Sequence, residues 1–345
     1  MAERGEGGST RLVEVDALRG IAAMAVVLFH MSTRYNQLFM PAETASWALP
    51  HGHYGVNLFF IISGFVIFMT LERTRRPMDF VISRFIRLFP AYWCAIVITF
   101  VITHALAMPI KTVTAAQAAG NFLMLHGYLG IPHVDGVYWT LEVELMFYLG
   151  MFTLFITGRL HRLVPVMLGV LALRIAYVWL ERGFGIELPW TLSRILILPY
   201  IPWFCLGIAI YKFVSTRDGA LRQWQVLAVA ALATLALTDG PGLAALAVVL
   251  ALMVWGAASA RLPWLGNRVL VWLGAISYPL YLLHENIGWC VILRLSERGV
   301  PIDLATLAAI ALALVMATLL HKWVEYPAMQ AIRRAYRARV QMAAG

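Results

Sequence analysis

An arginine and a histidine lie eleven residues apart in the first apolar stretch of the chain. Arg19 lies within residues 17–23, and His30 ends the stretch. At about 3.6 residues per turn, eleven residues make about three turns, so both side chains would share one helix face, roughly 16 Å apart along its axis. A guanidinium and an imidazole are costly to bury in a membrane, and such residues commonly belong to a functional pathway.

Two glutamates, Glu142 and Glu144, lie near the start of a later apolar stretch. A carboxylate beside an imidazole can take part in acid–base chemistry. The two glutamates would lie about 200° apart around a helix, so at most one can face a shared cavity. Glu142 is favoured because it shares a helix face with Tyr138. Glu144 has a simpler alternative, which is an ion pair with Arg174 or Arg194 from another span.

Tyr281 and His284 lie towards the end of the apolar stretch Ser277-Tyr278-Pro279-Leu280-Tyr281-Leu282-Leu283-His284. The expected topology brings them to the level of His30. Carboxylates, two imidazoles and a phenol at one depth, drawn from three helices, could form an acid–base site. The alternative is structural, because a lone histidine near the end of a span is more often an interhelical hydrogen-bond partner.

Two further arginines, Arg84 and Arg87, lie three residues apart at the expected cytoplasmic mouth of the third span. Side chains with this spacing are neighbours on a helix and can bind one ligand together. Arginine suits phosphate groups because its fork donates bidentate, charge-assisted hydrogen bonds. The alternative is that both arginines only anchor the cytoplasmic end of the helix.

The composition indicates the elements that must position these residues. Hydrophobic residues make up 61% of the chain and charged residues only 13%, whereas a soluble domain carries about 25% charged residues. Apolar stretches near the roughly 20 residues needed to cross a bilayer recur along the sequence. The sequence therefore predicts an all-α integral membrane protein of about ten transmembrane helices with a polar intramembrane cavity. The expected spans are 13–33, 54–71, 88–108, 137–158, 163–180, 193–212, 223–238, 243–258, 269–291 and 303–322.

The basic residues predict an orientation. With the N terminus inside, most of the 27 lysines and arginines fall in inner connections, so we expect both termini inside. Anionic membrane lipids, or an anionic cytoplasmic ligand, then account for the net charge of +9 without nucleic acid. We expect a multi-pass protein of the cell inner (plasma) membrane. Its parts would be a cytoplasmic tail (1–12), a transmembrane domain (13–325) and a basic cytoplasmic tail (326–345).

Other features carry less functional weight. The three cysteines show no metal-ligand spacing, and His51 and His53 have no cysteine or acidic partner nearby in the sequence, so we expect no metal site. Residues 1–11 are polar and no small-residue cleavage site follows the first apolar stretch, so we expect that stretch to be a retained span. Residues 114–130 are too polar for a span and are interpreted as a re-entrant or interfacial helix.

The motifs together resemble those of the membrane-bound acyltransferase 3 family. Asp16-Ala17-Leu18-Arg19-Gly20 followed by His30 resembles the Arg-x10-His opening of that family. Ser83-Arg84-Phe85-Ile86-Arg87 resembles its Arg-x-x-Arg segment. Residues 55–65, 139–144 and 277–284 also resemble segments of the family, and all occur in family order.

The resemblance implies an enzyme that transfers an acyl group, usually acetyl, from cytoplasmic acyl-CoA to a hydroxyl group. The expected acceptor is a carbohydrate or glycoconjugate, as in acylation of exopolysaccharide or O-antigen. In that family the histidine matching His30 is regarded as catalytic, and the arginines matching Arg19, Arg84 and Arg87 are implicated in function or donor binding. Many members carry an additional esterase-like domain, and we expect the stand-alone form here.

These residues suggest a mechanism. Our hypothesis is that neutral His30 acts as general base on the acceptor hydroxyl and that Glu142 orients or charge-balances it. A two-step route through an acyl-histidine competes with direct transfer. Neither route needs a metal. The alternative function is a transporter or flippase of a lipid-linked sugar, and the residues leave the acyl group, the acceptor and the oligomeric state open. The supporting residues would be Asp16, Glu144, Tyr281 and His284.

Overall fold

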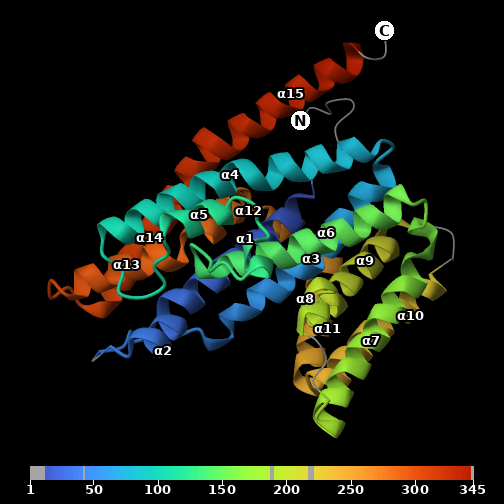
Figure 1. Ribbon diagram of the computed structural model, residues 1–345, viewed down its shortest axis with the longest axis horizontal. Helices are drawn as coiled ribbons and strands as arrows, with labels where there is room; N and C mark the ends of the chain where they lie inside the picture. Colours follow the sequence, from blue (N-terminus) through green and yellow to red (C-terminus); the bar gives the residue numbers. More distant parts are fainter. Residues whose placement is uncertain (1–11, 42, 187–189, 217–220, 343–345) are drawn as a thin grey trace.

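The computed structural model describes residues 12–41, 43–186, 190–216 and 221–342. Every regular element among these residues is helical, and they contain no strand (Figure 1). Seven helical stretches are long and apolar enough to cross a membrane, and α9 and α12 are shorter apolar helices. The all-helical prediction is confirmed for these residues, and the helices fit an integral membrane protein.

The order of elements follows the chain. The first half contains α1 (Val13–Phe29), the π-helical turn η1 (His30–Arg34), α2 (Tyr35–Phe39), the 3-10 turn η2 (Pro50–Tyr54), α3 (Gly55–Arg73), α4 (Pro77–Ala105), α5 (Ala115–Asn121), η3 (His126–Leu129), η4 (Gly136–Tyr138), α6 (Trp139–Ile156), η5 (Leu160–Arg162) and α7 (Leu163–Phe184). The second half contains α8 (Trp190–Ile195), α9 (Ile201–Ser215), α10 (Arg222–Thr238), α11 (Pro241–Ala258), η6 (Pro263–Gly266), α12 (Arg268–Leu283), α13 (Glu285–Ser296), α14 (Ile302–Leu320), η7 (His321–Glu325) and α15 (Tyr326–Met342).

Most of the expected apolar stretches fall on single helices, but three were wrong in their bounds or continuity, and the one expected at 193–212 is interrupted by turns between α8 and α9. Helix α4 begins at Pro77 rather than near residue 88, so Arg84 and Arg87 lie inside it. Proline is favoured in the first turn of a helix and arginine is a good helix former, so polarity alone did not mark the helix start. The stretch expected as one span at 269–291 is interrupted at His284, between α12 and α13. The number and direction of membrane crossings stay predictions.

Helices α1 and α12 cross at two glycines. A Cβ atom on Gly20 would lie 2.5 Å from the backbone nitrogen of Gly274, so a larger residue at position 20 would force the two backbones apart. Close packing at this crossing positions the ends of both helices. These ends carry His30 and His284, whose rings lie in contact.

The interruption after α12 lies shortly after a proline. Pro279 lies inside the helix, and proline has no backbone N–H to donate. The helix ends shortly afterwards at Leu283. Near this end, the carbonyl groups of Leu280 and Tyr281 accept hydrogen bonds from the ring of His284, at 3.2 and 2.9 Å from its Nδ1. The break therefore fixes the imidazole of His284.

The C-terminal residues that the sequence analysis assigned to a tail form helix α15 as far as Met342. It continues from α14 through the π-helical turn η7 and lies alongside α4 (Figure 1). The hydroxyl group of Tyr336 donates to Asp79 at 2.6 Å, which ties α15 to the first turn of α4. In the stretch 114–130, α5 forms a short helix that begins with a capping box between Thr114 and Gln117.

Candidate active site

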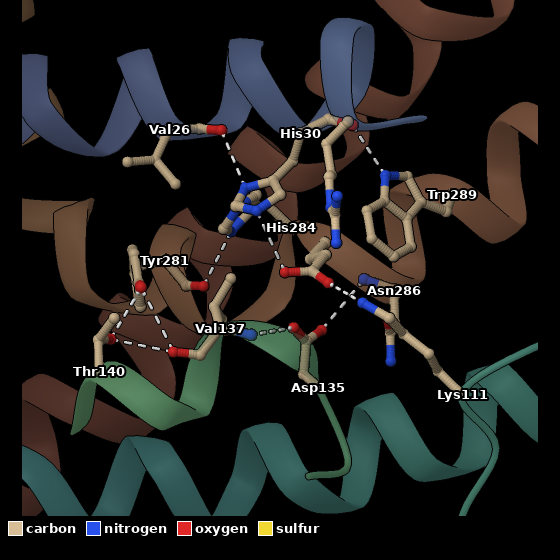
Figure 2. A network of polar contacts seen from close by, with 12 residues as sticks. Val26, His30, Lys111, Asp135, Val137, Thr140, Tyr281, His284, Asn286 and Trp289 are labelled. Atoms are coloured by element: carbon tan, nitrogen blue, oxygen red, sulfur yellow. Dashed lines mark hydrogen bonds and ion pairs between the residues drawn. The ribbon is translucent and has the colours of Figure 1, made fainter. Parts of the chain in front are cut away.

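His30 and His284 form the centre of a polar cluster between α1 and α12. Nδ1 of His30 lies 3.0 Å from Nε2 of His284 and 3.1 Å from the carbonyl oxygen of Val26. Figure 2 shows the two rings side by side. His284 is fully buried, whereas the side chain of His30 is 14% exposed. The predicted proximity of these two histidines is confirmed.

The carbonyl groups around the two rings favour one pair of tautomers. Nδ1 of His284 faces only carbonyl oxygens, so it carries a proton and Nε2 of neutral His284 is an acceptor. Nδ1 of His30 therefore carries a proton too, because it faces this acceptor and the carbonyl of Val26. Neutral His30 is left with an unprotonated Nε2, which is the basic atom of the ring.

Glu285, the first residue of α13, is the carboxylate at His30. Its Oε2 lies 3.3 Å from Nε2 of His30, and its Oε1 accepts a hydrogen bond from Lys111 at 2.8 Å. Lys111 also lies over the ring of Trp289, 4.5 Å from the centroid, and the Trp289 indole donates to the backbone oxygen of His30 at 2.8 Å. A proton taken up by His30 would therefore be stabilised by a carboxylate that is 3% exposed.

The loop before α6 holds Glu285 in place. A Cβ atom on Gly136 would collide with the Glu285 carboxylate, so a larger residue there would have to displace that side chain. The neighbouring Asp135 accepts from the backbone nitrogens of Val137 at 3.2 Å and Asn286 at 3.1 Å. Figure 2 shows Asp135 linking this loop to the start of α13. The sequence analysis missed Lys111, Asp135 and Glu285.

Tyr281 and Thr140 close the cluster on its other side. Their hydroxyl groups lie 2.8 Å apart, and the ring of Tyr281 lies 5.7 Å from that of His284. Both residues also line the central cavity described below. Tyr281 is therefore a shared wall between the cavity and the histidines.

The structure corrects the role expected for Glu142. Its Oε1 accepts from the backbone nitrogen of Gly127 at 2.5 Å, and its Oε2 accepts from Arg194 at 3.1 Å. The nearest imidazole to Glu142 is that of His126, with Nδ1 3.5 Å from Oε1, and the structure records no contact between Glu142 and His30. Helix α6 thus directs Glu142 towards the loop that precedes it and towards α8, whereas the break after α12 brings Glu285 to His30. The alternative in which Glu144 pairs with Arg174 or Arg194 does not match the contacts of the described residues, because Arg174 pairs with Asp239 and Arg194 with Glu142.

Glu142 also belongs to a group of residues that could bind a metal ion. Ligand atoms of His126, His133 and Glu142 all lie within 4.8 Å of one another. Nε2 of His126 lies 2.6 Å from Nδ1 of His133, and burial lowers the pKa of His126 to about 4. Two neutral imidazoles can share one hydrogen bond in this way. A divalent ion would have to compete with that bond and with the Arg194 cation on Glu142, so the residues fit a protein hydrogen-bond network better than a metal centre.

The four arginines of the protein's central cavity come from three helices. The cavity has a volume of about 190 Å³, and the predicted donor-binding residues Arg19, Arg84 and Arg87 all line it, together with Arg333 from α15. Apolar residues of α3 line it as well. The remaining lining residues are Val56, Phe59, Phe60, Ile62, Ser63, Val66, Ile67, Ser83, Leu88, Thr140, Leu141, Glu144, Tyr148, Ser277, Tyr278 and Tyr281.

The arginines of the cavity differ in their partners. Arg87 forms an ion pair with Glu325 of η7, which is 1% exposed and also contacts His321. Arg19 lies 3.6 Å from Asp16 on its own helix. Among the described residues Arg84 has no carboxylate partner. It donates to Ser83 at 3.3 Å and lies 5.9 Å from the centroid of the Tyr148 ring.

Of the two glutamates of α6, Glu144 rather than Glu142 faces this cavity. Its Oε1 accepts hydrogen bonds from the hydroxyl groups of Ser63 at 2.7 Å and Tyr148 at 2.5 Å. The expectation that only one of the pair faces the cavity agrees with the lining, but the choice of Glu142 was wrong. A signal for Glu285 was present in the sequence, because it is an acidic residue inside an otherwise apolar stretch, directly after His284.

The chain is similar to known proteins over most of its length. A family model described as an acyltransferase domain matches residues 12–321. The acyltransferase MdmB of Streptomyces mycarofaciens is 26% identical over 373 residues, which cover 94% of this chain and 93% of MdmB.

Two rhizobial proteins match shorter parts. Nodulation protein 10 of Rhizobium leguminosarum bv. viciae is 28% identical over 170 residues, covering 43% of this chain and 46% of that protein. The exopolysaccharide production protein ExoZ of Rhizobium meliloti (strain 1021) is 29% identical over 178 residues, covering 49% of this chain and 55% of ExoZ. No solved structure gives a significant match to the chain.

Proposed function

Since the chain belongs to the acyltransferase 3 family and is an acyltransferase, we propose that it transfers an acyl group, most often acetyl, from acyl-CoA to a hydroxyl group of a carbohydrate or glycoconjugate. The observation that carries the proposal is the position of His30. Its Nε2 is the basic atom of a partly exposed ring and lies 3.3 Å from a buried carboxylate. Membership of an acyltransferase family sets aside the transporter alternative.

His30 is the proposed general base. The acceptor hydroxyl gives its proton to Nε2 of His30 while its oxygen attacks the carbonyl carbon of the thioester. The new C–O bond forms as the C–S bond breaks, and the leaving thiolate takes the proton from the imidazolium. Glu285, held by Lys111, stabilises the imidazolium between these two events. Acylated acceptor and free CoA leave, and His30 is neutral again.

The central cavity is the proposed donor site. Phosphate groups bind well to arginine, and Arg84 lies at the cavity with no carboxylate partner among the described residues. The thioester end of the donor then points along the apolar residues of α3 towards Tyr281. Because Tyr281 is the wall between cavity and histidines, its side chain has to shift when the thioester reaches His30.

The proposal includes an orientation in the cell inner (plasma) membrane. Ten crossings with both termini inside would place Arg84 near the cytoplasm and His30 in the outer half, so that donor and acceptor approach from opposite sides. Single cysteines test this at Arg75→Cys and Phe184→Cys, both at exposed positions, after replacement of Cys94, Cys205 and Cys290. An impermeant thiol reagent should label the first only from inside and the second only from outside. Labelling from the reverse faces overturns the orientation.

Mass spectrometry of surface glycans tests the function itself. Cells that carry the gene and cells that lack it should differ by one acyl group on one glycan, and purified protein should consume acyl-CoA when that glycan is added. Identical glycans, together with no consumption of acyl-CoA, would contradict the proposal.

A further inference from the structure

A second hollow lies between α4 and α15, at the edge of the central cavity. Its volume is about 550 Å³. One face of each helix forms it, because the lining residues recur every three or four positions along both helices. They are Arg76, Asp79, Ile82, Ser83 and Ile86 from the α4 side, and Arg333, Tyr336, Arg337, Val340 and Gln341 from α15. We call this hollow the α4–α15 groove.

The groove adjoins the central cavity. Ser83 and Arg333 line both of them. Helix α15 lies along α4 over this boundary (Figure 1). A long, thin molecule could therefore occupy both spaces with one end in each. The α15 half of the groove lies beyond residues 12–321, which the family model matches.

The groove carries positive charge that the described residues do not neutralise. Arg76, Arg333 and Arg337 form no ion pair within the described part of the chain. Asp79 is the one carboxylate in the lining, and its Oδ1 accepts a hydrogen bond from Tyr336. The net charge of the lining is therefore positive. Apolar contact surface lies beside these cations on Ile82, Ile86 and Val340, and the phenol ring of Tyr336 lies among them.

We propose that the α4–α15 groove binds the nucleotide end of the acyl-CoA donor, its adenine and its phosphate groups. This inference rests on the proposed function, which supplies acyl-CoA as donor. The phosphate groups of coenzyme A carry about four negative charges at neutral pH, since a terminal phosphate carries close to two. Arg76, Arg333 and Arg337 of the groove, with Arg84 at the cavity, match that charge. Adenine contacts the apolar side chains and Tyr336.

The proposal gives each part of the acyl-CoA donor a position in the protein. The nucleotide lies in the groove, the uncharged pantetheine arm passes Ser83 and Arg84 into the central cavity, and the thioester ends near Tyr281. The charged end thus stays where cations are unpaired, and the uncharged arm lies along the apolar residues of α3. An anionic lipid headgroup offers similar phosphate chemistry, and the experiment has to separate the two sources.

Binding of two probes to the purified full-length protein tests the inference. Coenzyme A carries the nucleotide, and pantetheine lacks it. Arg333→Ala and Arg337→Ala should each weaken coenzyme A binding about tenfold, because each removes a charge-assisted contact to phosphate. Pantetheine binding should not change in Arg337→Ala, because Arg337 lines the groove and not the central cavity. Arg339→Ala is the matched control, since it removes the same charge from the same helix outside the groove lining.

The outcomes test separately whether the groove binds the nucleotide and whether acyl-CoA is the donor. Unchanged coenzyme A affinity in both groove variants, or an equal loss in Arg339→Ala, overturns the groove as a nucleotide site. Loss of binding to anionic vesicles with unchanged coenzyme A affinity assigns the groove to lipid and also overturns the proposal. If the unaltered protein binds neither coenzyme A nor acetyl-CoA, the proposed donor itself fails. Size-exclusion profiles of the variants verify that they remain folded.

Discussion

Two buried glutamates of this protein each lie between a cation and a histidine, yet their surroundings differ. Glu142 accepts one hydrogen bond from a protein donor on each oxygen, and its neighbour His126 is fully buried. Glu285 accepts from Lys111 on one oxygen, while the other faces Nε2 of His30, whose side chain is 14% exposed. Glu142 lines a hollow of about 370 Å³ together with His133 and Arg194, so the two carboxylates differ in the groups that they contact rather than in access.

Glu142 and Glu285 are the same residue type, but the contacts of Glu142 are structural, whereas those of Glu285 suit the proposed acid–base chemistry. A buried carboxylate with both oxygens bonded by protein donors holds elements together. A carboxylate with one oxygen beside a basic imidazole nitrogen can also balance the charge of a proton taken up there. The same distinction applies to the arginines, because Arg87 is paired with Glu325 and Arg84 has no carboxylate partner among the described residues.

The largest effect is expected from His30→Ala. Loss of a general base typically lowers the rate about 10²–10⁴-fold, so transfer should fall by at least a hundredfold while donor binding remains. Acyl transfer and acyl-CoA binding by the purified variant are the measurements. Near-normal transfer would remove His30 from the mechanism, and a trapped acyl-histidine in the unaltered protein would favour the two-step route.

Arg87→Ala should act mainly on stability. Removing one partner of a buried ion pair typically costs about 3–5 kcal/mol, and here it leaves His321 as the remaining ion-pair partner of Glu325 among the described residues. Thermal unfolding in detergent should therefore shift to clearly lower temperature, and Glu325→Gln should shift it in the same direction. Full stability of Arg87→Ala with much weaker donor binding would instead place Arg87 with the ligand-binding arginines.

In contrast to Arg87→Ala, Arg84→Ala should weaken donor binding more than it lowers stability. It removes a charge-assisted contact to donor phosphate, which is worth about 1.5–3 kcal/mol and corresponds to roughly 10–150-fold weaker binding. Titration with acyl-CoA measures this, and thermal stability should change little. Arg84→Lys should restore only part of the affinity, because an ammonium group cannot form the bidentate fork. Unchanged affinity in Arg84→Ala would return Arg84 to a helix-anchoring role.

The smallest effect on activity is expected from Glu142→Gln. The amide keeps the shape of the side chain but weakens the bond with Arg194, so stability should fall by about 1–3 kcal/mol while the transfer rate stays within a few-fold. Thermal unfolding and transfer assays on the same preparation measure both. A large loss of rate without loss of stability would restore the catalytic role that the sequence suggested.

The sequence predicted the features that depend on helix period. The helix period placed Tyr281 and His284 next to each other, and their rings lie 5.7 Å apart, whereas the shared face of Arg19 and His30 stays a prediction. The helix period does not determine which face of α6 points towards the cavity. Whether Glu142 or Glu144 faces the cavity therefore depends on how α6 packs against its neighbours.

The remaining site residues depend on irregular backbone and distant contacts. Glu285 reaches His30 because the helix breaks after Leu283, and Glu325 reaches Arg87 through a π-helical turn near the end of the chain. Lys111 lies in the connection between α4 and α5, where no periodic pattern is present. The acidic residue directly after His284 was a local signal for Glu285, but its contact with His30, like the other contacts, arises from tertiary packing.

The transfer rate of Glu285→Gln, measured beside that of Glu142→Gln at saturating acyl-CoA, tests the central claim most directly. Glutamine keeps the size of the side chain but cannot balance the charge of the His30 imidazolium, so a loss of one charged hydrogen bond predicts a rate about 10–150-fold lower for Glu285→Gln. Donor affinity should remain near that of the unaltered protein. A normal rate for Glu285→Gln, or an equal loss in both variants, would contradict the assignment of His30 and Glu285 as the acid–base pair.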